Sequence, residues 1–190
     1  PGGPNANQSV WRLDVGLAMK GERRLTVKEV LDALVAAGRI DHEAARTLAA
    51  KSPGKDNATR HALEIVAEAK LSDVQEGNRI LTLERLTVWL AGHCGLPYLR
   101  IDPLIVDVPK IGNMVTFNYA AWHGLLPISL TETEATIATS EPYLTAWIGQ
   151  LGQVLQRDIV RVIANPRDIE RYRREFFGVS NSVKGAIGAG

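Results

Sequence analysis

Apolar residues recur at helical spacing from Leu13 to about Gly95, and this pattern predicts a helical subdomain over residues 13–95. The first helix shows the pattern most clearly, because its apolar positions fall on one face: Val27, Val30, Leu31, Leu34 and Val35. Thr26 and Glu29 stand at the spacing of a capping box before this helix, and Gly38 supplies its left-handed stop. Further helices are predicted behind Asp41, over residues 58–71 and behind Thr82, with a loop over residues 51–57.

Beyond Gly95 the periodicity changes to short β-type runs that alternate with helices. The predicted strands cover residues 98–101, 125–130, 135–139 and 159–163. The predicted helices cover residues 115–123 and 143–155, the latter with Pro142 in its first turn, and a last helix behind Asn165. The order β-α-β-β-α-β-α predicts a small mixed-sheet α/β subdomain over residues 96–178. The fold class is therefore α+β, with the helical subdomain first.

The two ends of the chain lack the apolar periodicity of these subdomains. Residues 1–12 are rich in Pro, Gly, Asn and Gln and are predicted to be a disordered leader or a segment that docks on a partner. Trp11 lies in an amphipathic stretch there, and the pattern leaves open whether it docks on a partner or folds back. Residues 179–190 are predicted to be a linker.

A weak internal repeat relates two helical segments, residues 30–40 and 61–71, at an offset of 31 residues. Two amphipathic Ala/Leu helices also resemble each other by chance, so the pattern leaves duplication open.

Composition narrows the classes of function. The net charge of +1 gives no reason to expect a nucleic-acid partner, and the arginines near the C-terminus read as a solvated helix face. The single cysteine, Cys94, excludes an internal disulfide and favours a reducing cytosol. No apolar run is long enough to cross a membrane, so direct membrane insertion is not expected.

The motifs of common enzyme classes are missing from the sequence. It contains no G-x-x-x-x-G-K-[ST], G-x-G-x-x-G, G-x-S-x-G or H-E-x-x-H, so we expect no catalytic residue and no enzyme activity. His93 and Cys94 are adjacent but lack further ligands at zinc spacing, so no metal site is expected. Trp89, Trp122 and Trp147 lie among apolar residues and are predicted to be core.

Residues 82–186 carry an ordered series of segments: L-T-V-W-L-A at 86–91, G-L-P-Y at 95–98, I-D-P-L at 101–104, L-P-I at 126–128, I-A-T-S-E-P at 137–142, and F-F-G at 176–178 followed by S-V-K-G-A at 182–186. In this order and spacing they resemble the N-terminal domain of the type II secretion and type IV pilus assembly ATPases, the GspE/PilB-like family. The helical half resembles that domain more loosely.

The resemblance implies a non-catalytic regulatory and docking module. In that family the module couples the motor to the cytoplasmic domain of an inner-membrane platform protein, and the ATPase core follows in the same chain. It implies a bacterial, cytoplasmic protein held at the inner membrane through that partner. ATP and Mg²⁺ are expected only in a full-length parent, and this segment needs no cofactor. Secretion and pilus systems are not distinguished.

Some family members bind cyclic di-GMP through two copies of an R-L-G-x-x-L-V-x-x-G-x-I motif, in which arginine pairs with guanine or phosphate. In the first copy Leu34, Val35, Gly38 and Ile40 match, but Glu29 stands at the arginine position. In the second copy Arg60, Ile65, Val66 and Leu71 match. The resemblance thus suggests Leu34, Gly38, Arg60 and Val66 as ligand-binding residues, and a cyclic di-GMP sensor as the alternative function. Arg23 or Arg24 could replace the missing arginine in space. A small independent enzyme is a third, weaker hypothesis.

Overall fold

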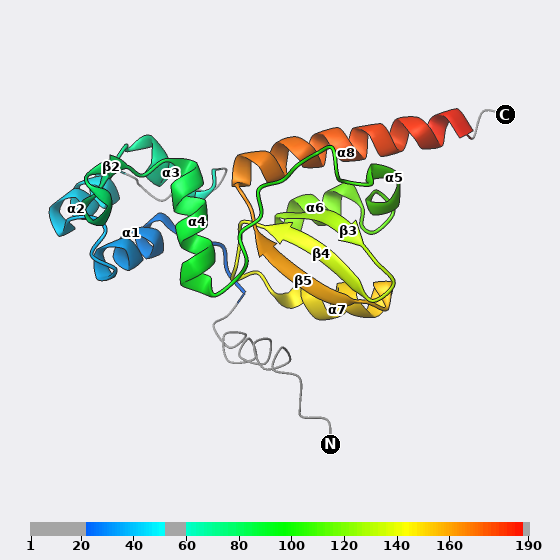
Figure 1. Ribbon diagram of the computed structural model, residues 1–190, viewed down its shortest axis with the longest axis horizontal. Helices are drawn as coiled ribbons and strands as arrows, with labels where there is room; N and C mark the ends of the chain where they lie inside the picture. Colours follow the sequence, from blue (N-terminus) through cyan, green and yellow to red (C-terminus); the bar gives the residue numbers. More distant parts are fainter. Residues whose placement is uncertain (1–21, 52–59, 188–190) are drawn as a thin grey trace, which may run out of the picture.

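The computed structural model describes residues 22–51 and 60–187, with side chains to residue 178, and arranges them as a helical part beside an α+β part (Figure 1). The predicted leader over residues 1–12, Trp11 and most of the predicted loop over residues 51–57 lie outside the described residues. The first helices are α1 (Val27–Ala36), α2 (His42–Lys51), α3 (Ala62–Glu68) and α4 (Leu83–Cys94).

The predicted capping box of α1 is present. The Glu29 N–H donates to Thr26 Oγ1 (3.2 Å), and the Thr26 N–H donates to Glu29 Oε2 (3.0 Å). Gly38 follows the helix with φ +66°, the left-handed conformation expected of a helix stop. Helix α3 is shorter than predicted, because the side chain of His61 caps it and Lys70, with φ +51°, turns the chain after it.

A small β-hairpin that the sequence did not predict fills the turn before α4. Strand β1 (Ser72–Asp73) pairs antiparallel with β2 (Arg79–Ile80), and η3 (Val74–Glu76) lies between them. Asp73 is buried there and accepts a hydrogen bond from Arg39 Nε at 2.9 Å. This charged pair connects the hairpin to the end of α1. The sequence did not predict the burial of Asp73, because an aspartate in a polar turn is usually exposed.

The second part has a three-stranded sheet in the order β3-β4-β5 (Figure 1). Its elements are α5 (Val108–Ile111), α6 (Phe117–His123), β3 (Leu125–Leu130), β4 (Glu134–Thr139), α7 (Ala146–Leu155), β5 (Asp158–Ile163) and α8 (Pro166–Ile187). Strands β3 and β4 run antiparallel, whereas β4 and β5 run parallel through the α7 crossover. The mixed sheet confirms the predicted α+β class.

Three details of the prediction for this part are wrong. The strand over residues 98–101 shrinks to one bridge between Tyr98 and Ile163, because the chain leaves the sheet edge after two hydrogen bonds. Helix α7 begins at Ala146, so Pro142 lies before it rather than in its first turn. Trp122 is 77% exposed instead of core, whereas Trp147 is fully buried.

Two hydrophobic clusters hold the fold together. One lies around the sheet and includes Trp147, Ile137 and Phe176, and the other lies among α1, α3 and α4 and includes Leu34 and Leu63. Ile163 of β5 belongs to the helical cluster, so β5 contributes to both. Helix α4 packs on α3 and on β5 and thereby joins the two parts.

Candidate functional site

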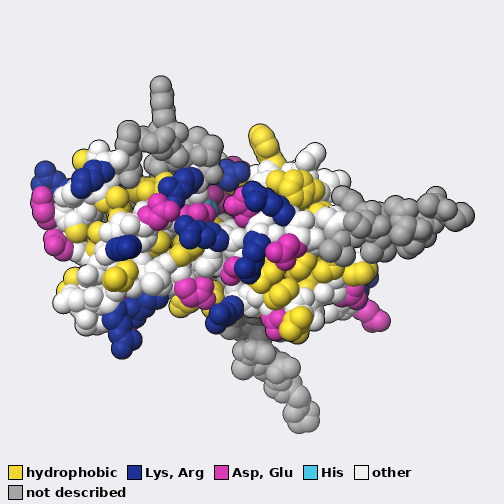
Figure 2. All heavy atoms as spheres, turned by 90° about the horizontal axis from the view of Figure 1, so that it is seen from above, with side chains coloured by type: hydrophobic (Ala, Val, Ile, Leu, Met, Phe, Trp, Pro, Cys, Tyr) yellow, Lys and Arg dark blue, Asp and Glu magenta, His cyan; other side chains and the backbone are white. Residues whose placement is uncertain are grey.

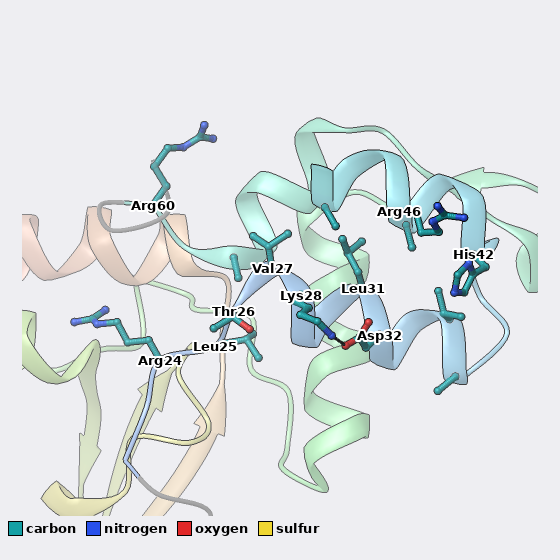
Figure 3. Close-up of a pocket in the computed structure, with 15 residues that line it drawn as sticks. Arg24, Leu25, Thr26, Val27, Lys28, Leu31, Asp32, His42, Arg46 and Arg60 are labelled. Carbon is teal, nitrogen blue, oxygen red and sulfur yellow. Dashed lines mark hydrogen bonds and ion pairs between the residues drawn. The ribbon is translucent and has the colours of Figure 1, made fainter. Parts of the chain in front are cut away.

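An open groove of about 790 Å³ lies along α1 and α2 (Figure 3). Its floor is apolar and includes Leu31, Val35 and Ala45, which the α1 and α2 faces bring together. Its rim is cationic, since four basic residues and one carboxylate supply its permanently charged side chains: Arg24, Lys28, Arg46, Arg60 and Asp32. An apolar floor with a cationic rim suits an amphipathic anionic ligand or an acidic protein segment.

Arg24 and Arg60 both line this groove, each close to the start of a helix. Arg24 lies just before the N-cap of α1, and Arg60 lies just before the N-cap of α3, and Figure 3 shows both side chains at the same end of the groove. Glu29, which occupies the arginine position of the first repeat copy, is instead used in the capping box and pairs with Arg23. The capping signal at Thr26 was the sequence feature that could have placed Arg24 here.

The four residues suggested from the resemblance do not share one surface. Leu34 and Val66 are 0% exposed and pack in the helical cluster, so neither offers surface to a ligand in this structure. Gly38 forms the turn after α1, with Gln75 Nε2 3.3 Å from the position a Cβ would take. Arg60 is exposed and pairs with Glu68. Ligand binding by these residues stays a prediction.

A polar junction joins the two parts of the molecule at the segment after β4. His61 Nδ1 accepts the Leu63 N–H at 3.2 Å, so the proton lies on Nε2, which donates to the Ser140 carbonyl oxygen at 3.0 Å. Burial is the main reason that the pKa of His61 is lowered, and the Arg24 charge lowers it further, against the opposing effects of Glu141 and the Ser140 carbonyl. The neutral imidazole therefore fits both partners.

Glu141 is the second component of the junction, and its side chain is only 5% exposed. Its carboxylate accepts the Leu25 N–H at 2.7 Å and lies 3.5 Å from Arg24 and 3.8 Å from His61. A buried carboxylate is tolerated when hydrogen bonds and a counter-charge compensate its desolvation. Glu141 of the α+β part thus organises three groups of the helical part.

A smaller pocket of about 210 Å³ opens at this junction. Arg24, Arg60 and Arg173 line it together with His61, so side chains of both parts of the molecule face it. Figure 2 shows Lys and Arg side chains, interspersed with Asp and Glu, over the surface where the two parts meet. Sequence reasoning missed Arg173, because nothing in the repeat pattern connects α8 with the helical part.

Exposed apolar side chains mark another surface in the α+β part. Leu104 is 91% and Ile105 is 76% exposed, and both lie in the turn that precedes α5. Asp102 fixes this turn, because its side chain accepts the Leu104 N–H at 2.9 Å and its carbonyl accepts the Ile105 N–H at 3.3 Å. Two aliphatic side chains are therefore presented to solvent by an ordered backbone.

The remaining candidate chemistry is structural. Burial raises the pKa of the Cys94 thiol, which makes a reactive thiolate unfavourable. Within residues 22–51 and 60–187 no group of three or more potential metal ligands comes together, and the expectation of no metal site stays a prediction. In the same residues, no helix combines the length and the apolar character needed to cross a bilayer.

Comparison with known proteins gives matches to one kind of domain. Residues 94–182 match the family described as the MshEN domain. The type IV pilus assembly ATPase TfpB of Acinetobacter baylyi is 27% identical over 154 residues, which cover 80% of this chain and 26% of TfpB. The chain therefore spans about a quarter of the length of that curated relative.

Solved structures give a similar result for the fold. The structure described as MshE with cdg has a TM-score of 0.54 at 19% identity and covers 77% of this chain and 97% of its own. A structure of the XpsE N-terminal domain has a TM-score of 0.49 at 12% identity, with 80% and 96% covered. The match to MshE shows a shared fold. Residues 34, 38, 60 and 66 all precede the segment that matches the MshEN family.

Proposed function

Because residues 94–182 match the MshEN domain family and the chain is similar to a type IV pilus assembly ATPase, we propose that it is a non-catalytic docking module that couples such a motor to a membrane-bound partner. The partner is the cytoplasmic domain of an inner-membrane platform protein. The ATPase core, with its ATP and Mg²⁺, lies in a full-length parent, and the module works in the cytoplasm, peripheral to the membrane.

The observation that carries this proposal is the aliphatic pair Leu104 and Ile105 on its ordered turn. Exposed apolar side chains are common singly, but two adjacent ones held by a fixed backbone form a suitable centre for a protein contact. They lie inside the MshEN segment. Burial of two such side chains contributes about 1.5–3 kcal/mol each to association.

A pull-down with the purified cytoplasmic domain of a platform protein tests the proposal. The wild-type chain is expected to bind, and the double variant Leu104→Ser/Ile105→Ser is expected to lose binding about tenfold or more. Val154→Ser is the matched control, because Val154 is also highly exposed but lies on α7. Absence of binding by the wild-type chain would contradict docking, and equal binding by the double variant would contradict this surface.

The alternative function is a cyclic di-GMP sensor, and one specific observation favours it. Arg24 and Arg60 both line the same end of one groove, with their guanidinium groups pointing in different directions in this structure, and a ligand with two phosphates or two guanines offers each of them a partner. MshE, which shares the fold, was solved with cdg. In this arrangement Arg24 replaces the arginine missing from the first repeat copy.

Calorimetry with cyclic di-GMP tests the sensor. Arg60→Ala and Arg24→Ala are each expected to abolish binding, whereas Arg85→Ala, which removes a charge elsewhere in the helical part, keeps it. A wild-type protein that gives neither heat nor a thermal shift would exclude the sensor and leave docking unaffected.

A further inference from the structure

The chain that leads into α1 is fastened to the N-terminus of α7. Glu22 Oε1 accepts hydrogen bonds from the Thr145 N–H at 2.7 Å and from the Thr145 hydroxyl at 2.9 Å, and it also accepts the Ala146 N–H. Thr145 is the N-cap residue of α7, and its own side chain makes no capping hydrogen bond. A carboxylate here is favoured by the partial positive charge of the helix end. Residues 1–21, the N-terminal segment, therefore join the described part of the chain at the start of α7.

Helix α7 has an unusual composition for a helix on the outside of the fold. Its ten residues include no charged side chain. Trp147 and Leu151 are buried, whereas Gln150 and Gln153 are exposed. Surface helices normally carry charged residues on the face opposite the core. An uncharged outer face loses less hydration when another segment covers it.

An open groove of about 740 Å³ lies beside α7, close to the Glu22 contact. Ile148 of α7 and Ile159 of β5 line it, and both side chains are half-buried. Gly152, one turn beyond Ile148, also lines the groove and adds no side chain to it. The volume lies within the roughly 300–1,000 Å³ of pockets that bury a ligand. Several apolar side chains of one peptide segment fit such a space.

The N-terminal segment supplies apolar side chains within reach of this groove. They lie at alternate or adjacent positions: Val10, Trp11, Leu13, Val15, Leu17 and Met19. The five residues from Leu17 to Glu22 span up to about 17 Å when extended. Gly152 lies only about 10 Å from Thr145 along the axis of α7. The segment is therefore long enough to enter the groove from its contact at Glu22.

The charges of the segment and of the groove are complementary. The rim of the groove carries two exposed carboxylates, Glu132 and Asp158. It also carries Arg157, whose Nε donates to the Thr131 carbonyl oxygen at 3.0 Å. The N-terminal segment contains two basic residues and one acidic residue: Arg12, Lys20 and Asp14. A net positive segment thus meets a net negative rim, which favours this pairing over pairing with a basic surface.

We propose that residues 10–19 fold back onto the α+β part and place their apolar side chains in the groove beside α7. Trp11 then makes an intramolecular contact, which is one of the two alternatives that the sequence leaves open. Because the segment continues through Glu22 into α1, its docking adds a connection between the α+β part and the helical part. A partner that binds residues 10–19 must displace them from α7.

Paramagnetic relaxation in the full chain tests where the segment lies. Ser9→Cys carries a spin label in a Cys94→Ala background, in which it is the single thiol. We expect the amide signals of Ile148, Gly152 and Ile159 to be lost and to return when the label is reduced. The signals of residues 74–76 should persist, because η3 lies in the helical part, away from α7 (Figure 1).

Variants of the N-terminal segment show whether its apolar side chains cause the contact. Val10→Ser/Leu13→Ser/Leu17→Ser is expected to restore the signals of the groove. The matched control is Asn5→Ser/Asn7→Ser/Gln8→Ser, which changes three polar residues of the same segment and should keep the signal losses. Neither variant alters the described residues, so both are expected to fold.

The quenching of Trp11 fluorescence by acrylamide is a second measurement. The contribution of Trp11 is the difference between the wild-type chain and Trp11→Phe. We expect Trp11 to be protected from acrylamide in the wild-type chain and to lose this protection in Ile159→Ser, which makes the groove polar. The spin-label result locates the segment even if Ile159→Ser does not fold.

The proposal is overturned if the label leaves the signals of Ile148, Gly152 and Ile159 unchanged, or if the triple apolar variant keeps the losses. It is also overturned if the losses appear when a labelled nitrogen-14 chain is mixed with an unlabelled nitrogen-15 chain, since the segment then binds a second copy. All of these measurements are made without a platform protein, so their outcome is independent of the docking proposal and of Leu104 and Ile105.

Discussion

The imidazole of His61 donates a hydrogen bond from Nε2 to the carbonyl oxygen of Ser140, 3.0 Å away, and this bond links the cap of α3 to the end of β4. The other ring nitrogen accepts the Leu63 N–H, so one neutral side chain both caps a helix and joins the two parts of the molecule. Protonation of Nδ1 would direct a second donor at the Leu63 N–H. The junction is therefore matched to a neutral histidine.

The free energy of unfolding is expected to fall as the pH is lowered through the range in which His61 becomes protonated. Burial lowers the pKa of His61 below its ordinary value of 6.5, so the unfolded chain binds the proton more readily than the folded one. The contribution of His61 is fully present above pH 6.5 and is lost as the pH falls from there through the lower folded value. Denaturant unfolding between about pH 8 and pH 5 measures the change.

His61→Asn provides the control for this pH dependence. Asparagine can cap α3 but does not titrate, so the variant should fold and show a flatter stability profile across the same range. Glu141 and Arg24 also face His61, and both remain in the variant. An unchanged slope in His61→Asn would mean that another group causes the pH dependence.

Replacement of Glu141 is expected to weaken the junction more than replacement of a surface carboxylate. Glu141→Ala removes the acceptor of the Leu25 N–H and the counter-charge of Arg24, and should lower the free energy of unfolding by about 1–3 kcal/mol. Urea unfolding followed by tryptophan fluorescence measures this loss. Glu132→Ala, at the exposed hairpin turn, should stay within about 0.5 kcal/mol of wild type, and equal losses in the two variants would contradict the role of Glu141.

Local signals predicted the local structure well. The capping box at Thr26, the stop at Gly38 and the cap at Thr82 all lie where the sequence placed them, because each depends on a few neighbouring residues. The mixed sheet followed from the order of β-type runs, since the helix before β5 favours a parallel crossover. These features need no information about distant contacts.

Features that depend on distant contacts were not predictable in this way. Trp122 was expected in the core from its apolar neighbours, but α6 spans only seven residues, too few to indicate which face is buried. The presence of Arg24, Arg60 and Arg173 around one pocket arises from packing between the two parts. The spacing of the repeat instead directed attention to Glu29 and to the buried Leu34 and Val66.

Among the residues suggested to bind a ligand, replacement of the buried Leu34 should destabilise the protein much more than replacement of the exposed Arg60. Leu34→Ala creates a cavity in the helical cluster and should cost about 2–5 kcal/mol, whereas Arg60→Ala removes an exposed side chain and should stay within about 0.5 kcal/mol of wild type. Chemical denaturation of both variants provides the test. A loss of less than about 1 kcal/mol for Leu34→Ala would contradict its place in the core.

A side chain at Gly124 is expected to destabilise the fold, chiefly through the backbone conformation there. Gly124 ends α6 with φ +67°, a conformation that costs an L-residue about 1–2 kcal/mol, whereas a Cβ there would lie 3.4 Å from Glu141 Cγ, within ordinary van der Waals contact. Gly124→Ala should therefore lower the free energy of unfolding by about 1–2 kcal/mol or more. Gly149→Ala, inside α7 with open space around its Cβ, should instead raise it by up to about 1 kcal/mol. Thermal and urea unfolding of both variants measure these changes. If the two substitutions change the free energy of unfolding in the same direction, the backbone conformation of Gly124 is not what determines the effect.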